Sequence, residues 1–503
     1  MYRVRTTKTA SGNTAVQIVQ RGSHRVKVIK HIGTARNADE LKDLVEKAHR
    51  HIVQTSTTNP LFPEMLDARK DTAVTVDDLE FTNTYHSFAY EFLTYFYERC
   101  GFGNLGNDLL RDLAIMRIIE PCSKLHAVEL LKEYFGKQYG KTVMYEKLPK
   151  IKELKKEIER HAVTYAREYL SFDFSLVFYD VTTLYFETFK EDPEGFRTPG
   201  FSKDNKANQP QIVIGLIVTR EGFPVSCEVF EGNTFEGKTF IPTITKFRDA
   251  YDIKKLVVVA DAAMISFENV EKLKENKLSY IVGARIAGLK HNQMEEIGGN
   301  LAGIDKNTTR IETERGILIC DFSFTRYKKD KWEMEKQIAK ATKLLEKKEG
   351  VKRTKFIKNK DEKKTEQILN TELIEKTKLL LGIKGYYTNL TQETNETIII
   401  HYHNLWNVEK AFRIAKSDLE ARPIFHHKRE SIEVHILIVF VSLCVAKSIE
   451  LLTKLSIKRV RDIIWRILDI EFIDTFTKRE YRKRMTTRDN QMVAFLSTLK
   501  RKT

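Results

Sequence analysis

The stretch IIHYHNLWNVEKAFRIAKSDLEARPI, residues Ile399 to Ile424, predicts the helix around which the chain is organised. From about Leu405 to Leu419, apolar residues recur at steps of three and four, which is typical of an amphipathic helix. A second face carries four polar residues, Tyr402, Glu409, Arg413 and Lys416. They share one stripe if the helix begins early enough to include the tyrosine. This stripe is either a local salt-bridge pattern or part of a functional site, and the rest of the chain decides between them.

The composition favours a basic globular protein with a polyanionic partner. At 503 residues the chain is too long for one core, so it should hold several domains. Lysine and arginine total 85 against 69 acidic residues, which gives a net charge of +16. Nucleic acid is the commonest partner for such an excess, although a merely basic protein has the same composition. The five cysteines form no CxxC pair, so we expect neither a disulfide framework nor a zinc knuckle. This cysteine usage fits a protein of the reducing cytosol.

Neither the N-terminal residues nor the most apolar run of the sequence predicts a membrane protein. The first residues, MYRVRTTKTASGN, are charged and lack the apolar segment of a signal peptide. The most apolar run, from Ile436 to Ala446, is shorter than the about 20 residues that a membrane span needs. We therefore expect a buried helix there and no membrane association.

The first third of the chain predicts two folded parts and a linker. Residues 1–55 suggest a small α+β unit, with three short strands and a helix that Asn37 caps. Residues 56–82 are predicted to be a linker. Residues 83–172 have a helical pattern and form a candidate DNA-binding domain, in which apolar stripes flank a break at Pro121. These two helices are either a DNA-binding pair or plain bundle core, and the second is commoner.

The rest of the chain predicts an α/β core with an inserted segment. Residues 173–287 alternate strands and helices, which indicates the first part of a mixed-sheet core. Residues 288–395 are an insertion whose lysine-rich part, Tyr327 to Lys364, is either a solvated helix or a phosphate-contacting arm. Strand-like ETIIIHYH precedes the core helices of residues 396–455, and residues 456–503 are predicted to be basic and helical.

Two aspartates follow buried strands of this core. Asp180 comes after the apolar run Leu176 to Tyr179, and Asp261 comes after Leu256 to Ala260. A carboxylate at the end of a buried strand requires a cation, a metal or a chemical role, because burying it unpaired is costly. With Glu409 on a later helix, the two aspartates are what a two-metal phosphoryl-transfer site requires. Oxygen ligands without histidine or cysteine favour Mg²⁺ over zinc.

The order strand-Asp, strand-Asp, helix-Glu resembles the RNase H-like core of DDE transposases. The insertion-sequence subgroup that it resembles has an insertion before the glutamate helix and the signature Y-(2)-R-(3)-E-(6)-K. Here Tyr402, Glu409 and Lys416 match that spacing, whereas Leu405 stands in place of the arginine. Arg413, one turn beyond the glutamate, is a candidate replacement for that cation. Further stretches with the same resemblance are IIEPCSKLHAVELL, FYDVTTLYFET, GFSKDNKANQPQIVIGLIV, FEGNTFEGKTF, LVVVADAAMIS and LWNVEKAFRIAKSDLEARPIFH.

The resemblance implies an enzyme that binds the terminal inverted repeats of its element, cleaves one strand with Mg²⁺ or Mn²⁺, and transfers the freed 3′-OH to target DNA. It implies a homodimer that pairs two DNA ends in the bacterial cytoplasm, at the nucleoid. It assigns catalysis and metal binding to Asp180, Asp261 and Glu409. DNA contacts would come from Tyr402, Arg413 and Lys416, and also from Lys203 and Lys206. The alternatives are a catalytically inactive, transposase-derived DNA-binding protein, and another RNase H-like nuclease such as a junction resolvase.

Overall fold

The computed structural model describes residues 2–21, 26–55, 79–188, 192, 195–201, 208–264, 266–314, 316–346, 354–359, 367–475 and 478–485. The chain divides into two compact units, each described here by itself. The first comprises Met1–Phe92, Leu130–Lys137 and Asp462–Thr503, and the second comprises Leu93–Glu129 and Gln138–Arg461. The expected helical domain of residues 83–172 is therefore not separate, because most of it belongs to the same unit as the core.

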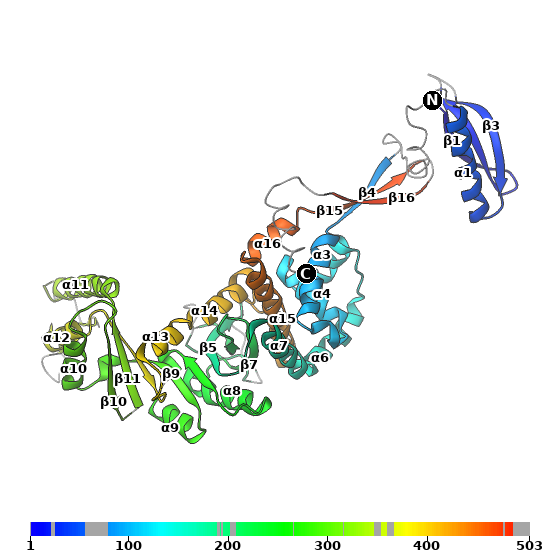
Figure 1. Ribbon diagram of the computed structural model, residues 1–503. Helices are drawn as coiled ribbons and strands as arrows, with labels where there is room; N and C mark the ends of the chain where they lie inside the picture. The colour runs from blue at the N-terminus through cyan, green and yellow to red at the C-terminus, as the bar shows by residue number, and fades with distance from the viewer. Residues whose placement is uncertain are drawn as a thin grey trace. The chain divides into compact units, whose positions relative to one another are not determined.

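The N-terminal part of the first unit is the predicted α+β fold. Its elements are β1 (Tyr2–Lys8), β2 (Thr14–Arg21), β3 (Val26–Ala35) and α1 (Ala38–Thr55). The three strands form an antiparallel sheet in the order β1-β2-β3, and α1 packs along it (Figure 1). Val16 and Ile18 of β2 are buried against Val45 and Ala48 of the helix. The Asn37 side chain accepts a hydrogen bond from Glu40 N at 2.8 Å, so it caps α1 as expected.

A second sheet of this unit joins distant parts of the sequence. Its strands are β4 (Leu79–Tyr85), β15 (Leu468–Asp474) and β16 (Glu480–Met485), with β15 in the centre. The prediction of a linker over residues 56–82 is therefore wrong for residues 79–82, which belong to β4. Residues 56–78 lie outside the described residues. The prediction of a helical C-terminal region holds for α16 (Ile457–Ile464) but is wrong for β15 and β16. Phe472 pairs in register with Phe81, a contact that local sequence cannot reveal.

The chain from Ser87 to Leu170 is helical, and most of it belongs to the second unit. Its helices are α3 (Ser87–Arg99), η3 (Phe102–Leu105), α4 (Asp108–Ile119), α5 (Lys124–Phe135), α6 (Lys141–Glu153) and α7 (Lys155–Leu170). Ten of the twelve residues of α4 are buried, and the helix packs against α6 and α15 (Arg429–Thr453). This burial favours the bundle-core interpretation, because α4 has no free face for a DNA groove. Ser123 Oγ accepts a hydrogen bond from His126 N at 3.2 Å and begins α5 after the Pro121 break.

The large sheet of the second unit has the predicted mixed arrangement. The strands that belong to the core are β5 (Leu176–Tyr185), β6 (Gln211–Val218), β7 (Pro224–Glu231), β8 (Val257–Ala260) and β9 (Ser279–Ala284). Their order is β7-β6-β5-β8-β9, in which β5, β6 and β7 are antiparallel and β5, β8 and β9 are parallel. A three-stranded meander followed by two parallel strands is the expected RNase H-like core.

Helices cover both faces of this sheet, and alternation along β5 assigns a face to each side chain. Tyr179 donates a hydrogen bond to Thr239 at 2.7 Å on α8 (Glu236–Ala250). Thr182 and Leu184, of the opposite parity, line an apolar pocket with residues of α15. Asp180 therefore belongs to the face that α15 covers. The connections after β8 contain η4 (Ala262–Met264), α9 (Phe267–Glu275) and η5 (Ile286–Gly288).

The insertion extends the sheet. Its elements are α10 (His291–Leu301), β10 (Thr308–Thr313), β11 (Gly316–Phe322), α11 (Phe324–Glu346), β12 (Ile357–Asn359), β13 (Gln367–Leu369), α12 (Thr371–Leu379) and β14 (Ile383–Thr388). β14 pairs antiparallel with β9, and β11 and β10 continue outward. The lysine-rich part is mostly α11, which buries Met334 and Ala341 and exposes most of its lysines. This pattern favours the solvated-helix interpretation.

The organising stretch is two helices. α13 (Asn395–His403) replaces the expected strand ETIIIHYH, and α14 (Trp406–Arg413) continues into the π-helical turn η6 (Ile414–Asp418). Thr394 Oγ1 accepts a hydrogen bond from Thr397 N at 3.2 Å, a cap that outweighs the strand propensity of three isoleucines. Figure 1 shows α13 beside β9 and α14 beside β5.

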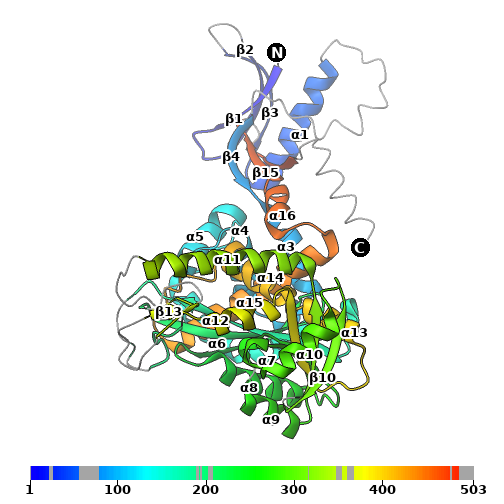
Figure 2. The same ribbon diagram turned by 90° about the vertical axis from the view of Figure 1, so that its left-hand side faces the viewer.

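The apolar helix α15 follows, and Figure 2 shows it in the interior of the second unit. Of the helices in the described part of the chain, it is the one long and apolar enough to cross a membrane. Its most apolar stretch is 83% buried within the protein, as a core helix would be.

Candidate active site

Parallel pairing of β5 and β8 brings the two aspartates to the same end of the sheet. Tyr179 pairs with Ala260, so Asp180 and Asp261 each follow a matched position. Asp261 lies just beyond β8, as predicted. Asp180 does not end its strand, because β5 continues in antiparallel pairing with β6 to Tyr185. Each aspartate accepts a hydrogen bond from the next backbone N–H, at 2.8 Å for Asp180 and 2.7 Å for Asp261.

Glu409 is held at the surface by contacts on both sides of α14. Val408 and Phe412 are buried beneath the helix. Asn407 Nδ2 donates a hydrogen bond to Arg220 O at 2.9 Å, and the Lys410 ammonium lies 3.4 Å from the Glu450 carboxylate. The helix is therefore fixed to the sheet while Glu409 remains exposed.

Asp180 and Glu409 border one hollow that is open to solvent and has a volume of about 330 Å³. We call it the acidic hollow, and three cations also line it, Arg413, Lys416 and Arg422. The predicted stripe of Glu409, Arg413 and Lys416 therefore faces one space. This geometry places two carboxylates beside cationic groups that can bind an anionic substrate.

Tyr402 reaches the site from a different helix. It lies near the end of α13, and its hydroxyl donates a hydrogen bond to Asp261 Oδ1 at 3.3 Å. Burial raises the pKa of this phenol, and the negative charges of Asp261, Glu409 and Asp180 raise it further. We call Asp180, Asp261 and Glu409 the acidic triad. They come from three elements, and the Tyr402 hydroxyl contacts Asp261 among them.

A glycine makes room for the tyrosine. A Cβ added to Gly283 on β9 would lie 2.5 Å from the Tyr402 hydroxyl oxygen and 3.0 Å from Ala262 N. Any larger residue at this position would displace the hydroxyl from Asp261. No local pattern singles out Gly283, because Tyr402, which it contacts, is 119 positions away in the sequence.

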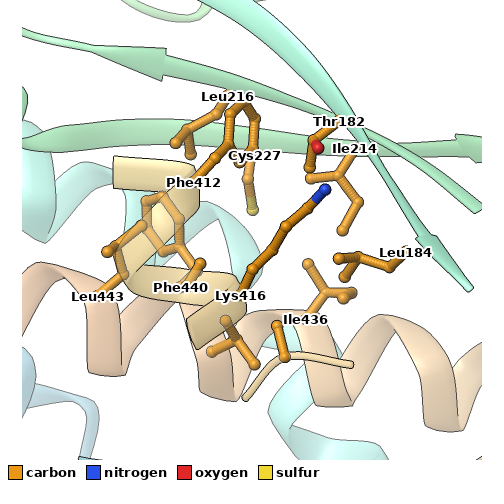
Figure 3. Close-up of a pocket in the computed structure, with 13 residues that line it drawn as sticks. Thr182, Leu184, Ile214, Leu216, Cys227, Phe412, Lys416, Ile436, Phe440 and Leu443 are labelled. Atoms are coloured by element: carbon orange, nitrogen blue, oxygen red, sulfur yellow. The ribbon is translucent and has the colours of Figure 1, made fainter. Parts of the chain in front are cut away.

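Lys416 is half-buried rather than fully extended into solvent. Figure 3 shows its side chain running between apolar residues of the sheet and of α15, with the nitrogen directed toward Thr182. The same side chain also borders the acidic hollow. Its aliphatic stem therefore contributes to packing while its charge lies beside the carboxylates.

Comparison with known proteins places these features in a family. Residues 172–445 match the family described as the transposase DDE domain, a span that exceeds half of the chain and contains the acidic triad. The chain belongs to the DDE transposase family. It is thus a member of a family of DNA-transposition enzymes, as the resemblance predicted.

Among solved structures, the transposase is similar to a cryo-EM structure described as a piggyBac transposase synaptic complex with hairpin DNA. The identity is 9%, the match covers 85% of this chain and 77% of that chain, and the TM-score is 0.36. A Mos1 transposase paired-end complex with left transposon end is 13% identical, with 47% of this chain and 71% of that chain covered and a TM-score of 0.16. No curated protein sequence matches the chain. The family assignment rests on the domain match.

Sequence reasoning missed Lys384, a residue of the insertion that lies at the site of this transposase. Lys384 is on β14, and its ammonium lies 4.7 Å from the centre of the Tyr402 ring. Burial lowers the pKa of Lys384 and nearby Arg326 lowers it further, whereas Asp321, Asp261 and Glu409 act in the opposite direction. In the sequence, Lys384 is a single lysine before GYYTNL, and no local pattern indicates that it lies beside Tyr402.

The donor types of the acidic triad fit a hard divalent cation, because carboxylate oxygens are what Mg²⁺ prefers. The accumulated negative charge that acts on Tyr402 fits a cation as well. Within the described residues, however, no three acidic, histidine or cysteine side chains are already arranged as a metal-binding group. The parallel pairing of β5 and β8 brings Asp180 and Asp261 to one end of the sheet, and shared metal binding by the acidic triad stays a prediction.

Two predicted DNA-contacting residues, Lys203 and Lys206, lie outside the described residues. Their expected role stays a prediction.

A buried basic cluster lies beneath the segment that follows η6. Lys124 Nζ contacts His426 Nε2, and Arg117 donates a hydrogen bond to Cys122 O at 3.0 Å. Burial lowers the pKa of Lys124 to about 7, and the charge of Arg117 contributes. The stretch Ile118–Leu131, which shares the family resemblance, thus includes the lysine that packs against this segment.

Proposed function

We propose that this transposase binds the terminal inverted repeats of an insertion sequence and uses the acidic triad for metal-dependent strand cleavage and strand transfer. One arrangement carries the proposal. Asp180 and Glu409 border one hollow that is lined by cations, and Asp261 lies at the same end of the sheet as Asp180, where it accepts a hydrogen bond from the Tyr402 hydroxyl at 3.3 Å. The domain match supports transposition as the general activity.

The chemistry follows from the residue types. Asp180, Asp261 and Glu409 would hold Mg²⁺, or Mn²⁺ in its place. A bound divalent ion of this kind activates an oxygen nucleophile and stabilises the leaving oxygen of a phosphodiester. Arg413 and Arg422, whose forks suit phosphate oxygens, would orient the scissile strand at the acidic hollow.

Tyr402 has a positioning part in the proposal. Its hydroxyl donates to Asp261, which fixes the orientation of that carboxylate and leaves the other oxygen for a cation. A phenol is protonated at neutral pH, so the hydroxyl is available as a donor. Tyr402 would therefore position Asp261, and its predicted contact with DNA stays part of the proposal.

The remaining parts of the proposal concern partners and location. The net charge of +16 supports binding to polyanionic DNA, both element ends and target. We propose a homodimer that pairs two ends, working in the cytoplasm at the nucleoid.

The test uses the full chain and duplex DNA carrying the terminal repeats that flank its reading frame. Asp180→Asn and Asp261→Asn retain side-chain shape and remove charge, so both should bind this DNA normally and lose Mg²⁺-dependent cleavage. Asp249→Asn is the matched control, because Asp249 is exposed and paired with Arg248 outside the site. Unchanged cleavage in either triad variant would place the active site elsewhere. A wild-type protein that binds the repeats without cleaving them would support a DNA-binding function instead.

A further inference from the structure

The insertion delivers one cation to the end of the sheet where the acidic triad lies. Lys384 is the second residue of β14, between β9 of the core and β11 of the insertion. The pairing of Gly385 with Ala284 places Lys384 just beyond the end of β9. Ala260 of β8 pairs with Val282 of β9, so Asp261 lies at the same end of the sheet. The sheet order therefore brings a residue of the insertion to the aspartate of the core.

The contacts of Lys384 join the insertion to the triad. Its ammonium lies 4.7 Å from the centre of the Tyr402 ring, the ring whose hydroxyl donates to Asp261. Asp321 is its cross-strand partner on β11. The Asp321 carboxylate in turn accepts a hydrogen bond from the Tyr386 hydroxyl at 2.7 Å. Lys384 is half-buried, so one side of it packs on aromatic rings and the other meets solvent.

The position that carries arginine in the related signature cannot supply a cation here. Leu405 occupies it, and this side chain is 5% exposed in the core. Its backbone N–H donates to Tyr402 O at 3.0 Å, in the turn between α13 and α14. A buried leucine therefore stands where the signature has arginine, whereas Arg413 lines the acidic hollow with Asp180.

We propose that Lys384 contacts a DNA phosphate beside the Tyr402–Asp261 pair and supplies the positive charge that Leu405 does not. The inference rests on the proposed function, and it assigns to the insertion a direct part in substrate binding. A lysine is suited to this position because its ammonium is a point charge that packs over an aromatic ring and still reaches a phosphate oxygen. A phosphate at this position would lie beside the Lys384 ammonium. The nearby carboxylates would not repel it if a divalent cation neutralised their charge.

The experiment measures DNA affinity of the full chain at three salt concentrations, with Ca²⁺ in place of Mg²⁺ to support binding. The probe is a fluorescein-labelled duplex carrying the flanking terminal repeat, with a duplex of unrelated sequence beside it. Lys384→Met removes the charge and keeps the length of the side chain. It should reduce the slope of log K against log salt by about 0.9, the value for one phosphate contact on duplex DNA. Lys384→Arg keeps the charge and should keep the slope.

Two controls separate substrate binding from packing. Lys376→Met removes a lysine of α12 that pairs with Glu372 at the surface, and it should leave the slope unchanged. Leu405→Arg in the Lys384→Met background should not restore the slope, because position 405 is in the core. If Lys384→Met does not fold, Lys384→Gln takes its place in the same comparison.

The outcomes distinguish this inference from the proposed function. A folded Lys384→Met protein with the wild-type salt slope would overturn the inference and leave Lys384 as a packing residue. Absence of Mg²⁺-dependent cleavage by the wild type would overturn the proposed function, while the salt slopes would still decide whether Lys384 contacts DNA.

Discussion

Gly283 offers a direct test of how the site is assembled, because one methyl group there should reach the tyrosine that holds Asp261. The added Cβ would lie 2.5 Å from the Tyr402 hydroxyl oxygen, whereas ordinary contacts begin near 3.5 Å. The hydroxyl must then shift by about 1 Å. Its hydrogen bond to Asp261, already 3.3 Å long, would be lost.

The cost follows from overpacking in a buried site. Gly283→Ala should destabilise the second unit by about 1–3 kcal/mol. Tyr402→Phe removes the atom that the methyl group meets, so the same substitution should cost about 1 kcal/mol less in that background. A smaller penalty remains there, because Ala262 N and Cβ lie 3.0 and 3.1 Å from the added atom.

The measurement is a double-mutant cycle by thermal unfolding of the full chain, read as the shift of the second unit's transition. A change of 1 kcal/mol corresponds to about 1–2 °C in a unit of this size, because the entropy of unfolding grows with the number of residues. Cleavage of terminal-repeat DNA with Mg²⁺ should fall in Gly283→Ala and in Tyr402→Phe, because both remove the donor to Asp261. Gly288→Ala is the control, since nothing lies within 4 Å of its added Cβ.

Equal losses of thermal stability from Gly283→Ala in the wild-type and Tyr402→Phe backgrounds would refute the reasoning. The methyl group would then be accommodated without moving the hydroxyl. Unchanged cleavage in a stably folded Gly283→Ala protein would separate the Tyr402–Asp261 contact from catalysis.

Two further predictions concern half-buried Lys416 and buried Lys124. Lys416→Ala should lower the free energy of unfolding by about 1–3 kcal/mol, because the aliphatic stem of Lys416 fills space beside Thr182. Lys416→Met should retain that packing and reduce the slope of log K for DNA against log salt by about 0.9. Equal unfolding free energies of the alanine and methionine variants would show that the stem does not pack. Burial lowers the pKa of Lys124 to about 7 in the folded chain, so Lys124 binds its proton more weakly there than in the unfolded chain. The free energy of unfolding should therefore rise between about pH 7 and pH 10.5, by at most about 1.4 kcal/mol per pH unit. Chemical denaturation should show this rise in the wild type and its loss in Lys124→Met, and a pH-independent difference between the two proteins would contradict it.

Local patterns in the sequence were sufficient for much of the fold. The N-terminal α+β unit followed from turn residues and the Asn37 cap, which act within a few positions. The strands that lead to Asp180 and Asp261 followed from runs of buried β-branched and apolar residues. The shared face of Glu409 and Arg413 followed from helical spacing, which α14 retains.

Other features depended on segments that are far apart in the chain. The stretch ETIIIHYH has the composition of a strand, but a threonine cap and the burial of Ile398 and Tyr402 make it α13. The basic C-terminal segment contains β15 because β4, nearly 400 positions earlier, pairs with it. Strand propensity is weak, so the available partner decides.

The sequence by itself was sufficient to predict which carboxylates belong together, since their order and the strands and helix that carry them are local properties. Only the tertiary structure decided what surrounds them. Gly283 gives space to Tyr402, and Lys384 comes to the same ring from an insertion that the sequence places outside the core. The physical reason is that β14 pairs antiparallel with β9 through backbone hydrogen bonds. These bonds use groups that nearly all residues share, so the pairing of two distant strands cannot be predicted from their side chains.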